Sequence, residues 1–154
     1  MTEYRLDNGM SLTVQEVTRA VGGPAIWKGA VKDLDDLVAR LRSGLPYPVL
    51  EAICRDFGLD LKEIAPILGI PWTTLMRRRR ARRFRPDESD RVYRVARIAT
   101  MAAAVLEGKE RAARWLREPN RALGGQVPLT MLDTDVGARQ VESVLGRIEH
   151  GVYS

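Results

Sequence analysis

A dense run of arginines is the part of this sequence best suited to chemistry, and that chemistry is the binding of anions. Ten arginines fall between Arg77 and Arg97 against three acidic residues, so this window has a net charge of +7. The whole chain carries +5, so the remaining residues sum to −2. The basicity is therefore local, which is typical of a nucleic-acid contact. A solvated helix face rich in arginine is the alternative interpretation.

Catalytic chemistry finds little support in the sequence. The chain has one histidine, one cysteine, no cluster of metal-ligand residues and no glycine loop for binding phosphate. We therefore expect neither an enzyme nor a bound cofactor. Cys54 lies on an apolar helical face and is interpreted as a small buried residue, without the partner that a reactive thiol needs.

The composition favours a cytoplasmic protein. No apolar run approaches the roughly 18 residues of a membrane span. The first residues include early acids and lack the apolar core of a signal peptide. A single cysteine cannot form an internal disulfide, which fits a reducing compartment.

The spacing of apolar residues predicts a mainly α fold. Helices are expected to begin at Asp33 and near Pro48, and glycines follow each of them. A long helix is predicted over residues 86–106, a short one over 109–117, and a last one from Asp133 or Thr134 to Gly151. Residues 1–32 stay unassigned: the start is a small hairpin or a disordered arm, and Gly22-Gly23-Pro24 resembles a linker.

Residues 60–80 have the pattern of a helix-turn-helix, which would place the arginine run against DNA. Asp60 and Glu63 resemble a capping box, and the small Ala65 lets two helices cross closely. Gly69 allows a sharp turn, and Pro71 suits the first position of the second helix. Arg78 departs from the pattern, because an apolar residue usually stands there.

The second helix of this pattern would supply the DNA contacts. Residues near its start meet base edges in the major groove, and later arginines reach phosphates. Trp72 has a competing role, because it can pack at the turn instead of touching DNA. Arg85 is also placed for phosphates. The predicted DNA-binding residues are Trp72, Thr73, Met76, Arg77, Arg79, Arg80, Arg82 and Arg83.

The second half of the chain resembles a known family. The stretch W-L-R-E-P-N-R-A-L-G-G at residues 115–125 and the terminal G-R-I-E-H-G at residues 146–151 are its most specific motifs. With the Arg77-Arg78 pair and residues 88–94, they resemble the Xre/MbcA/ParS antitoxins over roughly residues 34–154. The resemblance implies an Xre-like helix-turn-helix domain at 33–106 and a small helical toxin-binding domain at 107–154. It also implies a non-enzymatic antitoxin whose usual partner is a RES-domain toxin that consumes NAD.

The last helix and the tail are the expected toxin-binding surface. One face of this helix carries Val136, Val141, Val144, Leu145 and Ile148, and the last four would anchor it to its own domain, which leaves the opposite face and the tail for a partner. His150 has an alternative role at the helix C-terminus, where a protonated imidazole suits the dipole. The predicted toxin-binding residues are Arg139, Glu142, Arg147, His150, Val152, Tyr153 and Ser154.

The leading hypothesis is an antitoxin that inhibits its toxin and represses its own operon through operator DNA. One alternative is a plain transcription regulator whose C-terminal domain only dimerises. Another keeps toxin binding but uses the helix-turn-helix for dimerisation, which the unusual Arg78 favours. An NAD-degrading enzyme is poorly supported. We expect a homodimer, because the apolar faces at residues 34–41 and 49–57 exceed what one small helix pair needs.

Overall fold

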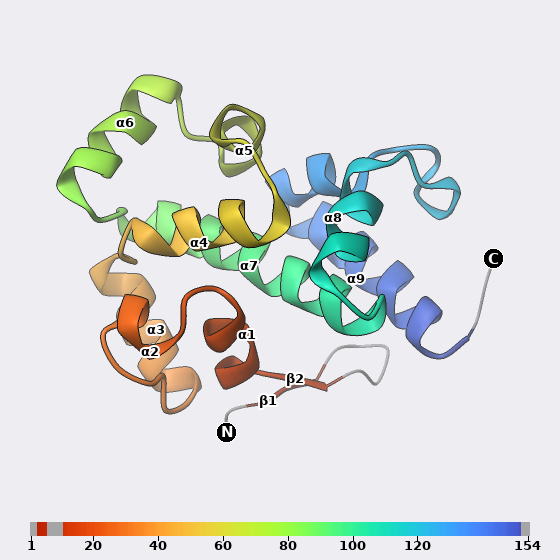
Figure 1. The fold of residues 1–154 in the computed structure, drawn as a ribbon, viewed down its shortest axis with the longest axis horizontal. Helices are drawn as coiled ribbons and strands as arrows, with labels where there is room; N and C mark the ends of the chain where they lie inside the picture. The colour runs from red at the N-terminus through yellow and green to blue at the C-terminus, as the bar shows by residue number, and fades with distance from the viewer. Residues whose placement is uncertain (1–2, 6–10, 152–154) are drawn as a thin grey trace.

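The computed structural model describes residues 3–5 and 11–151, and its fold is mainly α, as predicted. Two short antiparallel strands precede a series of helices (Figure 1). The elements are β1 (Glu3–Arg5), β2 (Ser11–Thr13), α1 (Val14–Ala20), α2 (Gly23–Trp27), α3 (Leu34–Ser43), α4 (Pro48–Phe57), α5 (Leu61–Leu68), α6 (Trp72–Ala81), α7 (Pro86–Val105), α8 (Lys109–Arg117), the 3₁₀ turns η1 (Arg121–Leu123) and η2 (Pro128–Asp133), and α9 (Asp135–Glu149).

The long helix α7 is the axis of the molecule. It packs against α1, α3, α4 and α5, which precede it in the sequence, and against α8, η2 and α9, which follow it (Figure 1). Pro86 stands in its first turn with Asp87 and Glu88, where a fixed φ and negative charge favour a helix start. Its buried alanines, among them Ala96, Ala99 and Ala102, let neighbouring helices approach closely. A single hydrophobic cluster therefore runs through both ends of the molecule.

The helices predicted after residue 32 are confirmed with small shifts. Asp33 accepts a hydrogen bond from the Asp36 amide and begins α3, and Gly58 ends α4 in the left-handed conformation. The long helix ends at Val105, one residue before the predicted end. Thr134, one of the two candidate caps, begins α9 by accepting from the Gly137 amide. No described helix is long and apolar enough to span a membrane.

The N-terminal segment is more ordered than the sequence indicates. The linker interpretation of Gly22-Gly23-Pro24 is wrong, because α2 begins at Gly23. Trp27 is 2% exposed, its indole N–H donates to the Val21 carbonyl at 3.2 Å, and its ring meets that of Tyr93 edge to face. The segment is therefore part of the main core, and α1 packs on α7.

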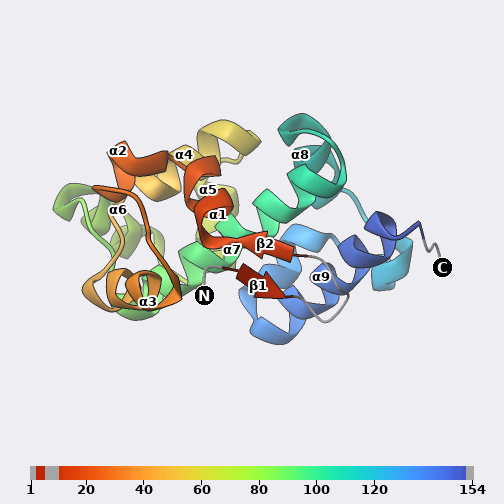
Figure 2. The same cartoon turned by 90° about the horizontal axis from the view of Figure 1, so that it is seen from below.

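The hairpin alternative for the start of the chain agrees with the described strands. Residues 3–5 pair antiparallel with residues 11–13, and Figure 2 shows the two strands beside α1. Thr13 then starts α1 through a capping box with Glu16. The expected turn at Asp7-Asn8-Gly9 lies outside the described residues.

The apolar face of α4 does not support a homodimer, because the chain itself covers that face. Val49, Leu50, Ile53 and Phe57 of α4 are fully buried within the chain itself. The N-terminal segment supplies part of the cover, since α2 packs on α4. Val38 of α3, at 41% exposed, is the large apolar side chain that this region leaves open among the described residues. The sequence could not reveal this because residues 1–32 had no assigned structure.

Candidate nucleic-acid interface and partner-binding region

The corner between α5 and α6 has the two-helix geometry that the sequence predicts. Gly69 ends α5 at a φ of +63°, and Arg91 of α7 donates to the Leu68 carbonyl at 2.8 Å, which secures the turn. The predicted capping box is wrong, because Asp60 accepts from the Lys62 amide at 2.9 Å and not from Glu63. Pro71 is the residue before α6, not its first helical residue.

The two faces of α6 differ sharply. Leu75 is fully buried and fastens the helix to the core, whereas Thr73, Arg77 and Arg80 are exposed. The prediction that Met76 points outward is wrong in part, because Met76 is half-buried and packs against the core. One face of the helix is therefore available to a partner over most of its length.

Arg78 is the residue that departs from the helix-turn-helix pattern, and the structure explains it. Its guanidinium forms two hydrogen bonds with the Glu88 carboxylate, at 2.7 and 3.1 Å. The Arg78 and Glu88 side chains are 16% and 7% exposed. The charged pair thus fills an inward position that an apolar residue usually occupies, and it joins α6 to the first turn of α7.

The electrostatics of this pair match its geometry. Burial tends to raise the pKa of Glu88, but hydrogen bonds from the Arg78 guanidinium and the Arg85 amide outweigh it and lower the pKa. The Glu88 hydrogen bond correspondingly raises the pKa of Arg78. Both groups stay charged, and their ion pair is part of the fold, so neither group is offered to a binding partner.

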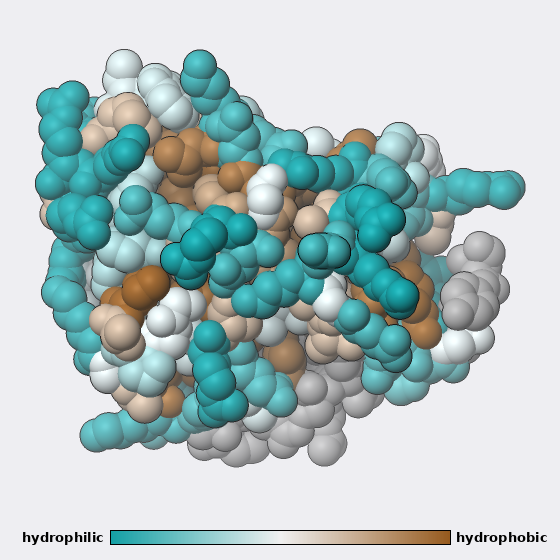
Figure 3. Space-filling model, in the orientation of Figure 1, coloured by the Kyte–Doolittle hydropathy of each residue, from teal (hydrophilic) through white to brown (hydrophobic). Residues whose placement is uncertain are grey.

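The remaining acids of the arginine window also pair with nearby arginines. Asp87 bonds Arg91 at 3.1 Å, Asp90 lies 3.9 Å from Arg94, and Arg97 pairs with Glu142 of α9. No carboxylate among the described residues pairs with Arg77, Arg79, Arg80, Arg83 or Arg85. The positive charge left over is therefore concentrated on α6 and the loop after it, along a strongly hydrophilic edge of the molecule (Figure 3).

Two of the predicted phosphate-binding arginines, Arg82 and Arg83, also make contacts within the chain. Arg83 donates to the Ser43 carbonyl at 2.8 Å and to that of Gly44 at 3.3 Å, at the end of α3. Arg82 ends α6 with a φ of +63°, and its side chain lies 3.5 Å from Glu51. Both residues are exposed, but part of their hydrogen-bonding capacity is used inside the chain.

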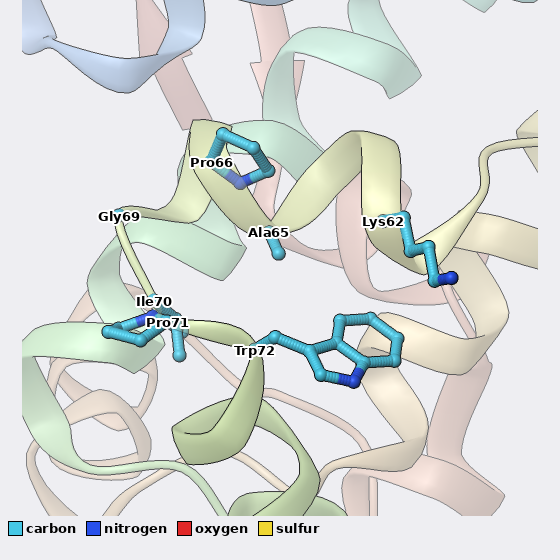
Figure 4. Close-up of a pocket in the computed structure, with 7 residues that line it drawn as sticks. All are labelled: Lys62, Ala65, Pro66, Gly69, Ile70, Pro71 and Trp72. Carbon is cyan, nitrogen blue, oxygen red and sulfur yellow. The ribbon is translucent and has the colours of Figure 1, made fainter.

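Trp72 is 41% exposed at the first position of α6. It lines an apolar groove between α5 and α6, and the Lys62 ammonium lies 5.8 Å from the centre of its ring (Figure 4). Neither predicted role describes it fully, because it packs along the turn and still presents a face to solvent. The sequence did not single out Lys62, because its position beside Trp72 depends on how α5 faces α6.

The residues of the most specific motif build the C-terminal region. Leu116 is 1% exposed, and Trp115 is half-buried against the core. Asn120 accepts from the Ala122 amide at 2.9 Å, as expected for a loop-stabilising side chain. Gly124 has a φ of +67°, which favours glycine. These residues shape the region through packing and backbone geometry.

The inner face of α9 is confirmed at most positions and wrong at one. Val141 and Leu145 are fully buried, and Val144 is 4% exposed. Val136 is instead 70% exposed, since it lies at the start of the helix beyond the edge of the packed core. Gly137 lets the start of α9 lie close to η2, because a Cβ at this position would lie 2.1 Å from the Met131 carbonyl oxygen.

The predicted toxin-binding residues differ in exposure and in their contacts within the chain. Arg139 is exposed and pairs with Asp135 at 3.0 Å, and His150 is the exposed cap at the end of α9. Glu142 is not on a free face, because its ion pair with Arg97 holds α9 to α7. Arg147 is half-buried. Residues Val152, Tyr153 and Ser154 lie outside the described part of the chain.

Polar bonds connect the C-terminal region to the helix-turn-helix. Arg117 of α8 pairs with Glu63 of α5 at 2.8 Å and also donates to the Gly58 carbonyl. Lys109 bonds Asp56 of α4 at 3.1 Å. Turn η2 also packs on α5, so the two regions share an interface and not a free linker.

Comparison with known proteins matches two parts of the chain to family models. Residues 36–97 match the Antitoxin Xre-like helix-turn-helix domain, and residues 101–151 match the Antitoxin Xre/MbcA/ParS C-terminal toxin-binding domain. A curated protein named Antitoxin Xre from Yersinia enterocolitica is 36% identical, with 88% of this chain and 89% of the relative aligned. An Antitoxin Xre from Photorhabdus laumondii is 38% identical over 77% of this chain and 81% of its own length. This chain therefore belongs to the Xre family of antitoxins.

Proposed function

We propose that this protein is the antitoxin of a type II toxin–antitoxin pair, that it inhibits an NAD-consuming RES-domain toxin by direct binding, and that it represses its own operon through operator DNA. It acts by binding and carries out no reaction of its own. The observation that supports the DNA-binding part most strongly is the set of arginines on and after α6 that have no acidic partner in the described part of the chain. The match of residues 101–151 to a toxin-binding domain supports the rest.

The arginines suit DNA because of where they lie. Thr73, Arg77 and Arg80 lie on the exposed face of the second helix of the pair, which is the helix that enters the major groove in this motif. Arg77 also donates to the Thr74 hydroxyl at 3.1 Å, which limits the freedom of its guanidinium before any base is bound. An arginine so held can form two hydrogen bonds to guanine.

The alternative in which α5 and α6 serve dimerisation alone loses its main support. Arg78 is the residue that favours that alternative, because its charge departs from the pattern of a DNA-binding helix pair. The bidentate pair with Glu88 accommodates that charge inside the fold and leaves the outer face of α6 unaltered. A plain transcription regulator is disfavoured by the length of the C-terminal match.

A homodimer remains part of the proposal on grounds of DNA symmetry. One helix-turn-helix reads a half-site, and two copies related by a twofold axis suit a palindromic operator. Light scattering at micromolar concentration, with and without duplex DNA, tests this. A monomer under both conditions contradicts it.

The decisive experiment for the toxin part is coexpression with the product of the neighbouring gene. We expect the two proteins to copurify, cells with the toxin alone to lose NAD and stop growing, and coexpression to restore both. A variant cut after Glu149 tests the role of the tail, and we expect weaker neutralisation with unchanged helical content. Full protection by that variant would move the inhibitory surface onto α9 or elsewhere in the region. Absence of copurification and rescue with the full chain would contradict the proposal.

A further inference from the structure

The outer face of helix α3 combines two charges with an apolar centre. Asp35, Val38, Ala39 and Arg42 are exposed, and their spacing of three and four residues places them in one stripe along the helix. Val38, at 41% exposed, lies in the middle of the stripe beside the small Ala39. Asp35 stands in the first turn of α3 and Arg42 in the last. The stripe is therefore acidic at one end, apolar in the centre and basic at the other end.

The two charges of this stripe differ from the other charged residues of α3. Asp36 and Arg40 form an ion pair at 3.2 Å, and Arg40 also donates to the Ala30 carbonyl at 3.2 Å, so they serve the fold. Asp35 and Arg42 have no ion-pair partner in the described part of the chain. Their signs suit the helix dipole, but the dipole does not account for the exposed apolar centre between them.

We propose that this outer face of α3 is the contact between two copies of the chain, which pack antiparallel across a twofold axis. Such an axis sets each Asp35 against Arg42 of the second copy and brings Val38 of one copy against Ala39 of the other. A parallel pair would instead place like charges side by side, which is repulsive. A surface that complements itself in this way fits a second copy of the chain. The inference rests on the homodimer of the proposed function and names the surface that forms it.

The place of α3 in the molecule suits a dimer whose other surfaces bind DNA and toxin. Both views show α3 at the same end of the molecule as α6, with α8 and α9 at the other end (Figure 1 and Figure 2). Two copies joined through α3 therefore keep their C-terminal regions away from the contact. One helix pair is smaller than a standard interface of about 1,600 Å², so we expect a weak dimer in free solution. A duplex with two half-sites should strengthen it, because DNA holds both copies together.

The test is charge reversal in the full-length protein, followed by sedimentation over a series of protein concentrations with and without a duplex from the region upstream of its gene. Asp35→Arg and Arg42→Asp each turn two attractive contacts of the dimer into repulsive ones, so each should raise the dimer dissociation constant by roughly tenfold. The double variant Asp35→Arg/Arg42→Asp restores opposite charges and should return the constant close to that of the unmodified protein. Arg114→Asp is the matched control, because Arg114 is exposed on α8, and it should have no effect.

Recovery in the double variant separates association from folding. Both reversed charges oppose the dipole of α3, so the double variant has the least favourable helix of the set, and restored dimers cannot come from a better fold. Circular dichroism checks the helical content of each variant.

The other outcomes overturn the assignment in distinguishable ways. If all variants dimerise like the unmodified protein, the copies meet elsewhere while the homodimer stands. If single reversals weaken the dimer and the double variant does not recover, the antiparallel pairing is wrong. A monomer with and without duplex contradicts both this surface and the homodimer. If the reversals release purified toxin and leave the dimer intact, the face binds toxin and not a second copy.

Discussion

The two halves of the arginine run, before and after Pro86, differ in exposure and in the contacts that their side chains make. In the first half Arg77, Arg79 and Arg80 are exposed and lack acidic partners among the described residues. In the second half Arg91 and Arg94 lie near Asp87 and Asp90 and also donate to backbone carbonyls of α5 and η2, and Arg97 pairs with Glu142. The same type of side chain is thus exposed without an acidic partner among the described residues at several positions of the first half, and is bonded within the fold in the second.

The difference follows from the helix on which each half lies. Helix α6 is short and at the surface, and Leu75 is its buried residue. Helix α7 is surrounded, so arginines between its apolar positions reach neighbouring helix ends and acids. A net charge summed over a window therefore overstates what a partner can bind. Arg78 belongs with the second group although it lies on α6, because it points inward to Glu88.

The largest expected effect comes from removing that inward arginine. Arg78→Ala should lower the free energy of unfolding by about 3 kcal/mol, because it leaves the Glu88 carboxylate nearly buried and without its partner. Chemical denaturation monitored by circular dichroism measures this. Arg79→Ala is the neighbouring control and should change stability by no more than about 0.5 kcal/mol. Equal effects of the two substitutions would show that Arg78 contributes no more to stability than the exposed Arg79.

Glu142 tests whether the pairing with Arg97 is structural. Glu142→Ala should cost about 2 kcal/mol of unfolding free energy, because a charge-assisted contact between α7 and α9 is lost and Arg97 stays poorly exposed. Glu149→Ala on the same helix is an exposed control and should be nearly neutral. A stable Glu142→Ala protein that fails to neutralise the toxin would restore Glu142 to the toxin surface.

The contrast between Arg77 and Arg91 concerns DNA directly. Arg77→Ala should weaken binding to the preferred site by about 1.5 kcal/mol and affect random duplex much less, because a guanidinium on a base edge carries sequence information. Arg91→Ala should instead lower thermal stability, since Arg91 supports the turn at Gly69, and should leave the preference between duplexes unchanged. Fluorescence anisotropy with both duplexes decides between these outcomes.

The smallest expected effect is a pH dependence from Glu88. Its pKa is lower in the folded chain than in the unfolded chain, where it is about 4.3. Its contribution to stability is therefore present above the unfolded pKa and is lost as the pH falls through the folded value. The stability difference between the unmodified protein and Glu88→Gln should shrink as the pH is lowered below about 4. A difference that stays constant to pH 3 would show that the Glu88 charge contributes little.

Local rules explain why the middle and end of the chain were predictable. Asp33, Gly58, Gly69 and Thr134 act through neighbours only a few residues away, so their effect on helix ends is visible in the sequence. The apolar positions at Val141, Val144 and Leu145 repeat at helical spacing for the same reason. Residues 14–32 had weaker local signals, because α1 and α2 have only seven and five residues and depend on packing against the core.

By itself the sequence determined the helical class, the α5–α6 turn and the local excess of positive charge, because each depends on backbone preferences or on composition over short distances. The tertiary structure decided which charges remain for a partner. Arg78 and Glu88 are ten residues apart, Arg97 and Glu142 lie on different helices, and Arg83 reaches the end of α3. Such pairs form only when packing brings distant segments together, so no spacing rule along the chain could separate the arginines of the fold from those of the surface.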